Sequence, residues 1–370
     1  MIKKIGEGKF KAELEANVRA CEAIRRDKTN PQDITLAEFM QEKNQISMED
    51  LYLDLGLDPY VDTIQNIINM PDPSLRWLIP EIYRDALRLG LRRNPIYPNV
   101  IAGEQSVSQT SVIMPAINMS DAAPKQVGPA ETILVGDVSF QQKTVKISKI
   151  GRGIKVPYEV IQYVSINLVA IFLQDFGVKL GMGIDSLMIN TLLNGDQANG
   201  SDAISVLGVN TPYTAPATST LKFRDLLKVW VRGGRLGKDF STMIAGEGMA
   251  EDILDLFVTT RLFGAPRANV NVKTPIPQSS DVYVHGGVPD NRVIVLDKST
   301  ALIKLNAQPL LIESDKIISN QTQETYATLT TGFATIFKDS RVAIDSTLDF
   351  ASNGFPSYMD PTSQENVIFN

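Results

Sequence analysis

The stretch from Ser165 to Asn194 constrains the fold of this chain more than any other. It reads SINLVAIFLQDFGVKLGMGIDSLMINTLLN, and only Asp175, Lys179 and Asp185 carry charge. As a helix it would be roughly 45 Å long at 1.5 Å per residue. Its apolar side chains fall almost all round such a helix, so it must be covered on most of its faces. We therefore predict a buried helical spine over Ser165–Asn194.

Three glycines, Gly177, Gly181 and Gly183, lie in the middle of this stretch. Each lowers helix propensity by about 1 kcal/mol, so packing must keep this part helical. Because glycine has no Cβ, these positions also let another backbone approach closely. Charges and glycines interrupt the stretch before about 18 unbroken apolar residues accumulate, which argues against a membrane span. We expect no membrane partner.

Length and charge limit the remaining choices. The 370 residues suffice for two or three compact units with a sizeable core. A net charge of −6 argues against binding that rests on nucleic-acid phosphates. The single cysteine, Cys21, allows no internal disulfide and suits a reducing compartment. The first residues show no apolar run or cleavage site of a secretory signal, so we expect a protein made in the cytoplasm.

The N-terminal quarter is helical and charged. Apolar residues at three- and four-residue spacing predict a helix over Phe10–Ile24. Capping boxes beginning at Thr35 and Ser47 predict helices over Leu36–Lys43 and Met48–Leu55. One interpretation is a helical arm or small module, and another is a DNA-binding helix-turn-helix. The last of these helices is acidic, which is wrong for a recognition helix near phosphates.

A basic run lies between Trp77 and Asn94. It holds Arg84, Arg88, Arg92 and Arg93. Such a run is typical of a solvated face or of salt bridges across an interface. An alternative is that these arginines line an inward face that meets packaged nucleic acid. We favour the solvated face or the salt bridges.

A long hairpin is predicted before the spine. Val107–Met114 and Val138–Ile150 read as its two arms, with apolar and polar residues alternating in the second. A hairpin between Asn118 and Gln141 reaches roughly 40 Å at about 3.3 Å per residue. An isolated two-stranded hairpin is marginal in water. The chain offers no obvious compensating run of its own, so we infer that this loop lies on a neighbouring molecule.

A mixed α/β region follows the spine. Helices near Phe223–Val231 and Met249–Val258 alternate with short apolar strands at Thr242–Ala245, Val282–Val284 and Val293–Leu296. This alternation predicts a sheet with helices packed against it.

The last third of the chain holds a long loop and two long strands. The loop, Gly264–Ser280, is rich in Pro and Asn, and loops of this length are uncommon unless functional. Leu310–Ser319 and Thr325–Phe337 read as the strands. The segment from Val342 carries several Asp and Glu residues and no Lys or Arg, and we interpret it as an acidic tail.

The sequence offers little for catalysis. His285 is the only histidine and has no cysteine nearby, so a zinc site is not indicated. There is no phosphate-binding loop and no nucleophile elbow, and Cys21 lies on a charged helix. We therefore predict a non-enzyme with no catalytic residues, no cofactor and no metal site.

Four stretches, taken in order, resemble one known family. They are SVSQTSVIMP with VGPAETILVGDVSFQQKTVKISKIGRGIKVPYEVI; SINLVAIFLQDFGVKLGMGIDSLMINTLLNGDQANG; LKFRDLLKVWVRGG with STMIAGEGMAEDILDLF; and LLIESDKIISNQTQETYATLTTGFATIFKDSRVAIDS. They resemble, respectively, the extended loop, the spine helix, the axial domain and the closing strands of a tailed-bacteriophage major capsid protein of the Hong Kong 97 type, which has the Johnson fold.

The resemblance implies an α+β fold with a long spine helix, an extended β-hairpin loop, a peripheral domain and an axial α/β domain. It also implies the following division of the chain: N-terminal helical arm 1–75, start of the peripheral domain 76–117, extended loop 118–141, peripheral domain with spine 142–195, axial domain 196–308, closing strands 309–350 and C-terminal tail 351–370.

By this resemblance the chain is a major head protein, a structural protein that self-assembles into the pentamers and hexamers of an icosahedral shell around double-stranded DNA. Its partners would be itself, portal, scaffolding or decoration proteins, and DNA lying nearby without sequence-specific binding. It would be located in the virion capsid after assembly in the host bacterial cytoplasm. An alternative is the shell protein of an encapsulin-type nanocompartment, which has the same fold, and a third is a DNA-binding regulator or enzyme.

The resemblance also implies contact residues. The extended loop would touch the adjacent subunit through Asp121, Pro124, Lys125 and Glu131, and the loop Gly264–Ser280 would lie toward a capsomer axis. Some relatives join subunits through a loop lysine and an asparagine assisted by a glutamate, which corresponds here to Lys125 and Asn353. No glutamate is evident beside that asparagine in the sequence. Some members lose an N-terminal segment to a protease, and because the chain is present from Met1 we expect no such cleavage.

Overall fold

The computed structural model describes residues 7–25, 34–44, 47–69, 78–93, 95–108, 111–120, 128–129, 137–196, 203–210, 221–261 and 281–360. The chain divides into two compact units, each described by itself below. The first comprises Met1–Pro95, Ser148–Asp185 and Asn306–Thr331, and the second comprises Ile96–Ile147, Ser186–Leu305 and Gly332–Asn370. The predicted loop Gly264–Ser280 lies outside the described residues.

The first unit begins with five helices: α1 (Glu7–Arg25), α2 (Leu36–Asn44), α3 (Met48–Asp54), α4 (Ile64–Ile68) and α5 (Leu78–Arg92). The helices predicted for the N-terminal quarter are therefore confirmed.

Both capping boxes form as predicted. The Glu38 N–H donates to the Thr35 hydroxyl at 3.2 Å, and the Thr35 N–H donates to the Glu38 carboxylate at 3.1 Å. Ser47 and Asp50 repeat this exchange at 3.1 and 3.3 Å. Each box satisfies N–H groups that the first turn of a helix leaves without partners.

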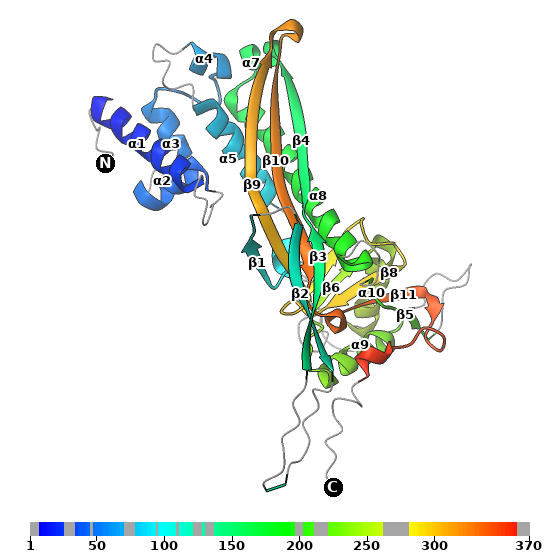
Figure 1. Ribbon diagram of the computed structural model, residues 1–370. Coiled ribbons are helices and arrows are strands. Elements are labelled where there is room, and N and C mark those ends of the chain that lie inside the picture. Colours follow the sequence, from blue (N-terminus) through cyan, green and yellow to red (C-terminus); the bar gives the residue numbers. More distant parts are fainter. Residues whose placement is uncertain are drawn as a thin grey trace. The chain divides into compact units, whose positions relative to one another are not determined.

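A four-stranded sheet has the order β1 (Gly103–Ser106), β9 (Leu302–Ile317), β10 (Thr322–Thr335) and β4 (Ser148–Pro157). β4 pairs antiparallel with β10 over ten residues, from Thr322↔Pro157 to Thr331↔Ser148, and β9, β10 and β4 lie side by side in Figure 1. The predicted pair of long strands is confirmed. A short 3₁₀ turn, η2 (Ile318–Asn320), connects β9 to β10.

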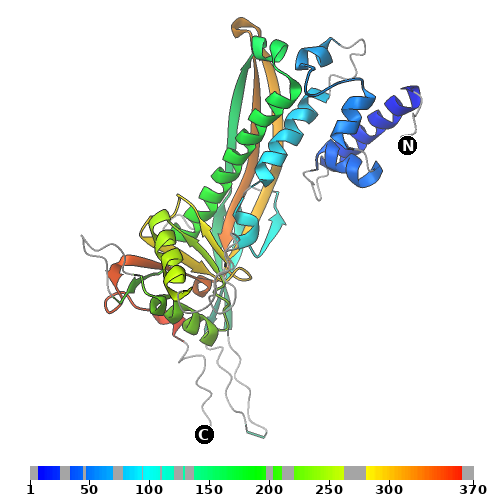
Figure 2. The same cartoon turned by 180° about the vertical axis from the view of Figure 1, so that it is seen from behind.

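The predicted spine is helix α8 (Ile166–Asn194), which follows the short helix α7 (Tyr158–Tyr163). α5 lies along α8, as Figure 2 shows from behind. One side of α8 is buried at a spacing of three and four residues, as expected for a helix with one face in a core. The buried residues of this side are Ile166, Val169, Leu173, Phe176, Leu180, Ile184 and Met188.

Two glycines face each other where α5 meets α8. A Cβ placed on Gly177 would lie 2.2 Å from the Leu87 carbonyl oxygen, and one on Gly90 would lie 2.0 Å from the Gln174 carbonyl oxygen. Both distances are far below van der Waals contact, so only glycine fits at either position. The expectation that a spine glycine admits a second backbone is confirmed at Gly177, where that backbone belongs to α5, but not at Gly183, where the nearest atom is a side-chain carbon of Ile150.

The other side of α8 differs from the prediction. Leu168, Ile171, Phe172 and Met182 are 43 to 60 % exposed, so in the single chain the spine is not covered on most of its faces. Among the helices of the described residues, α8 alone is long and apolar enough to cross a membrane. Its close contact with α5 is what a core helix makes, and Asp185 on it is 1 % exposed.

The second unit is built around a five-stranded sheet in the order β5 (Val206–Val209), β11 (Arg341–Asp349), β8 (Arg292–Leu296), β6 (Thr242–Ala245) and β7 (Asp281–Val284). The predicted helices of this region are confirmed as α9 and α10, and its three predicted strands are confirmed as β6, β7 and β8.

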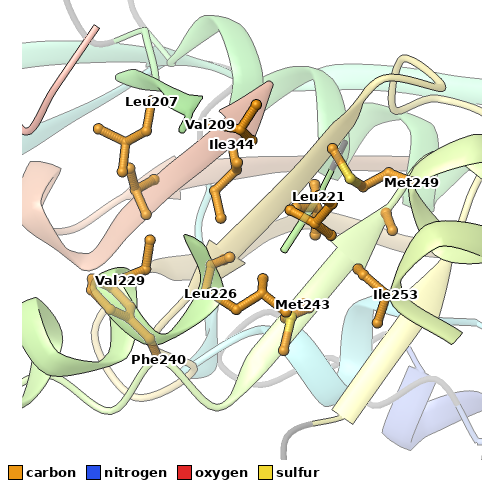
Figure 3. Packing of buried hydrophobic residues seen from close by; sticks show 14 of the residues in the cluster. Leu207, Val209, Leu221, Leu226, Val229, Phe240, Met243, Met249, Ile253 and Ile344 are labelled. Carbon is orange, nitrogen blue, oxygen red and sulfur yellow. The ribbon is translucent and has the colours of Figure 1, made fainter. Parts of the chain in front are cut away.

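Helices α9 (Phe223–Arg235) and α10 (Glu247–Arg261) supply buried residues to one apolar core. Leu226 and Val229 of α9 and Met249 and Ile253 of α10 meet side chains of the strands there (Figure 3). The unit also holds the short helix α6 (Tyr97–Val100) and the 3₁₀ turns η3 (Lys338–Ser340) and η4 (Ser357–Met359).

The interpretation of the segment from Val342 as an acidic tail is wrong for its first part, while residues 361–370 lie outside the described residues. Val342–Asp349 belong to β11, which lies between β5 and β8, with Val342 and Ile344 buried in the core. The acidic Asp345 accepts hydrogen bonds at 2.7 Å from Arg292 and from Asn291. Partners far away in the sequence therefore neutralise the charge that suggested an exposed tail.

Replacing Gly177 by Ala should destabilise the protein, because the added methyl group overlaps the α5 backbone. Overpacking of this kind costs about 1–3 kcal/mol. The matched control is Gly183→Ala on the same helix, where the nearest atom lies 3.9 Å away. That variant should be about 1 kcal/mol more stable through helix propensity. Urea unfolding followed by circular dichroism gives both values, and equal stability of the two variants would contradict the close contact.

Candidate assembly surfaces

The predicted hairpin is present as a ribbon of two strands, β2 (Ser111–Ser120) and β3 (Asp137–Lys146). The strands pair antiparallel over ten residues, from Ser111↔Lys146 to Ser120↔Asp137. They form a sheet of their own, joined to neither of the other sheets. The predicted bounds of both arms are partly wrong. The first arm begins at Ser111 and extends to Ser120, because residues assigned to the loop are paired. The second arm ends at Lys146, because Ser148–Ile150 belong to β4 and pair with β10.

Packing holds the base of the ribbon. Val145 and Ile147 are 1 and 8 % exposed, whereas Thr144 and Lys146 between and beside them are exposed. This alternation is typical of a strand with one face on a core. A Cβ on Gly332 would lie 3.1 Å from the Lys146 carbonyl oxygen, so β10 approaches the base closely. The β2–β3 sheet has two open edges, and each strand presents one of them.

The predicted contact residues of the loop, Asp121, Pro124, Lys125 and Glu131, lie outside the described residues. Asn353 is described and follows β11. Its N–H donates to the Asp349 carbonyl at 2.9 Å, its side-chain amide donates to the same oxygen at 3.3 Å, and its carbonyl accepts from the Gly208 N–H at 2.9 Å. These bonds give Asn353 a structural part in a turn, and its bond to Lys125 stays a prediction.

Denaturing gels of assembled particles test that bond directly. A lysine–asparagine link between subunits would leave dimers and higher species in detergent, and Lys125→Arg would remove them. A pattern of monomer-sized bands alone would dismiss the cross-link.

Three arginines of the basic run pair with glutamates of the same chain. Arg84 pairs with Glu81 at 2.6 Å, and Arg88 and Arg92 both pair with Glu38 of α2. Arg93 is exposed. The predicted salt bridges therefore exist, but those described connect parts of one subunit. Because Glu38 is shared by Arg88 and Arg92, and Glu81 by Arg84 and Arg25, these pairs offset only part of the positive charge of the run.

The same face of α5 holds helix α1. Arg25 donates to both carboxylate oxygens of Glu81, at 2.7 and 2.8 Å, and to the Ile34 carbonyl at 2.7 Å. Glu81 is 8 % exposed. Burial alone would raise the pKa of the Glu81 carboxyl, but hydrogen bonds from Arg25 and the charges of Arg25 and Arg84 outweigh it and hold the pKa below its ordinary value. A buried, bidentate arginine–carboxylate pair thus anchors α1 to α5.

The pKa of Asp85, one turn further along α5, is shifted in the opposite direction to that of Glu81. Burial raises its pKa above the ordinary value, and the hydrogen bond from the Thr35 hydroxyl at 3.3 Å only partly opposes this. The described residues of the N-terminal segment therefore contact α5 of their own chain. The assignment of residues 1–75 as an arm of the subunit, which the resemblance implies, stays a prediction.

Replacing Glu81 by Gln should lower the free energy of unfolding at pH 7 by about 3 kcal/mol, because it removes one partner of a buried ion pair. The depressed pKa of Glu81 means that its contribution is present above pH 4.5, its ordinary value, and is lost as the pH falls through the folded-state value. The difference between the native protein and this variant should therefore shrink on acidification. Asp85 is common to both proteins and cancels in the comparison.

Urea unfolding between pH 7 and pH 3 measures this difference, and Glu42→Gln on the exposed face of α2 is the control. A difference that stays constant across that range would mean that the charge of Glu81 does not hold the helices together.

His285 and Cys21 have structural surroundings. The His285 Nδ1 accepts a hydrogen bond from the Gly287 N–H at 2.9 Å, which closes a turn after β7. Cys21 is buried, and burial raises the pKa of its thiol, which makes it a poor nucleophile. Within the described ranges, no group of three or more His, Cys, Asp or Glu residues is arranged to hold a metal ion.

The sequence matches no protein-family profile and no curated protein. Among solved structures, the chain is similar to a virus-like particle from Pyrococcus furiosus, with a TM-score of 0.51 and 12 % identity over 72 % of this chain and 98 % of that one. It is also similar to the mature capsid of bacteriophage PhiM1, with a TM-score of 0.48 and 11 % identity over 68 % of this chain and 87 % of that one. A third similar structure is an encapsulin complex from Synechococcus elongatus, with a TM-score of 0.47 and 12 % identity over 72 % of this chain and 92 % of that one. At such identities the likeness concerns the fold alone, and it confirms the predicted fold class.

Proposed function

We propose that this chain, which has the Hong Kong 97-type capsid fold, is the major capsid protein of a tailed bacteriophage. Its copies would assemble as pentamers and hexamers into an icosahedral shell around double-stranded DNA. The observation that carries the proposal is the β2–β3 ribbon, a sheet of two ten-residue strands packed at its base.

A ribbon of this kind is marginal in water, because two strands bury too little surface to offset the entropy of ordering them. Both of its edges also present unpaired backbone groups. The surface of a second copy would supply the missing contacts. Since the ribbon and the surface that receives it are different parts of the subunit, the contact is heterologous, and such contacts form closed rings when the rotation between copies allows it.

The charge of the chain fits a wall around DNA better than a DNA-binding protein. Its net charge is −6, and the described arginines of α5 that form ion pairs do so with glutamates of the same chain. Packaged DNA would therefore lie beside the shell without sequence-specific binding. In this proposal the loop within 118–141 overlaps the neighbour and residues 196–308 form the axial domain. Portal, scaffolding or decoration proteins would be further partners, and assembly would take place in the bacterial cytoplasm.

Deleting Asp121–Glu131 tests the role of the ribbon. We expect a subunit that folds normally by circular dichroism but no longer forms shells, because the part that reaches the neighbour is gone. A variant in which a Gly/Ser segment of equal length replaces these residues separates length from side chains and should also assemble poorly. Normal shells from the deletion variant, seen by negative-stain microscopy, would refute the overlap.

The contents of particles purified from the natural source distinguish the two kinds of shell. Nuclease-protected double-stranded DNA inside closed particles would support a phage capsid. An enclosed enzyme without DNA would favour the encapsulin-type nanocompartment. A protein that stays a small, monodisperse oligomer at all concentrations would contradict both.

A further inference from the structure

Helix α9 presents a basic stripe with an apolar residue in it. Arg224, Lys228, Val231 and Arg235 follow one another at spacings of four, three and four residues, which places them on one face of the helix. Val231 is 64 % exposed, and Arg224 and Arg235 are exposed. The opposite face is buried in the core of the second unit, so this stripe points away from that core.

Helix α10 carries the corresponding acidic stripe. Glu247, Glu251, Leu254 and Asp255 lie on one face, and Leu254 is 43 % exposed while the three acidic residues are exposed as well. The other face of α10 packs into the same core as α9. Each helix therefore shows an exposed aliphatic residue preceded by two charges, and the charges of the two helices have opposite sign.

The two helices belong to different parts of the sheet. α10 contacts β6, β7 and β8, and β7 is one edge strand. The first half of α9 is tied to segments that follow β5, the other edge strand, and β11. Asp225 accepts a hydrogen bond from the Asn210 N–H at 3.2 Å, and the Lys228 ammonium lies 3.6 Å from the centre of the Phe350 ring. The first half of α9 and helix α10 are thus anchored to opposite sides of the sheet.

We propose that the α9 stripe of one copy docks against the α10 stripe of a second copy. This inference rests on the proposed shell function and names the surfaces through which neighbouring subunits meet. Because the two surfaces differ, the contact is head-to-tail and generates a ring when it closes. Exposed Val231 and Leu254 would form its apolar centre, and the charges around them would select the partner and its register.

The charges available for this contact are those that the chain leaves unpaired. Among the described residues, Arg224, Glu247 and Glu251 take part in no ion pair. Other cations of α9 are already engaged, since Arg232 lies 3.8 Å from Asp360 and 4.6 Å from the Phe355 ring centre. Arg224 and Glu251 are therefore the residues whose charge reversal disturbs the contact with least effect on the fold.

A charge swap tests the contact. Arg224→Glu and Glu251→Arg should each raise the concentration needed for assembly about tenfold, the effect of about 1.4 kcal/mol per contact, because each brings like charges together. The double variant restores opposite charges with the signs exchanged and should assemble at close to the native concentration. Lys298→Glu, at an exposed turn of the same unit, is the control and should leave assembly unchanged.

Analytical ultracentrifugation and negative-stain microscopy of the full chain provide the measurement, and circular dichroism verifies that each variant is folded. If the native chain forms shells and the single variants assemble equally well, the α9–α10 contact is wrong while the shell function stands. Defects in both single variants without rescue in the double variant would also overturn it. If the native chain forms no large assembly under any condition, the proposed function itself fails.

Discussion

The approach of two backbones at Gly90 and Gly177 is the contact on which the first unit depends. Each glycine occupies a place where a Cβ would overlap a carbonyl oxygen of the other helix, so α5 and α8 lie closer than helices with side chains at their contact. α8 then supplies a long buried stripe to the core, and α5 offers its other surface to the N-terminal helices. The ion pairs of Glu81 and Glu38 fix those helices on α5. Loosening the glycine contact would therefore affect the spine and the helices attached to it together.

Local patterns predict most elements of the fold. The spine helix, the two capping boxes and the short strands β6, β7 and β8 of the second unit all depend on residues within a few positions of one another, and the structure confirms them. Local patterns do not predict strand β11, because its acidic residues suggest an exposed segment. Asp345 is in fact bound by Asn291 and Arg292, which lie more than fifty residues earlier in the sequence. The exposed side of α8 is missed for a related reason: the apolar side chains of a helix do not reveal which of its faces the rest of the chain covers and which stay exposed.

The assembly surfaces are predictable to a smaller extent. Alternating residues indicated the two arms of the ribbon, and the absence of a compensating run indicated a neighbour as its support. The pairing of Arg25 with Glu81 joins residues 56 positions apart, and no spacing rule connects them. The opposite charges of α9 and α10 are visible in the sequence, but that Val231 and Leu254 are exposed beside these charges, and that both helices share one core, required the structure.

The central claim is that the β2–β3 ribbon obtains its support from another copy of the chain. Hydrogen–deuterium exchange of the backbone amides of Ser111–Ser120 and Asp137–Lys146 tests it most directly, with unassembled subunits compared with closed particles. The account predicts rapid exchange along the outer part of the ribbon in the subunit and strong protection in the particle, while the amides at its base, near Val145, are protected in both. Equal, strong protection of the whole ribbon in the solitary subunit would show that the chain stabilises it alone and would contradict the account.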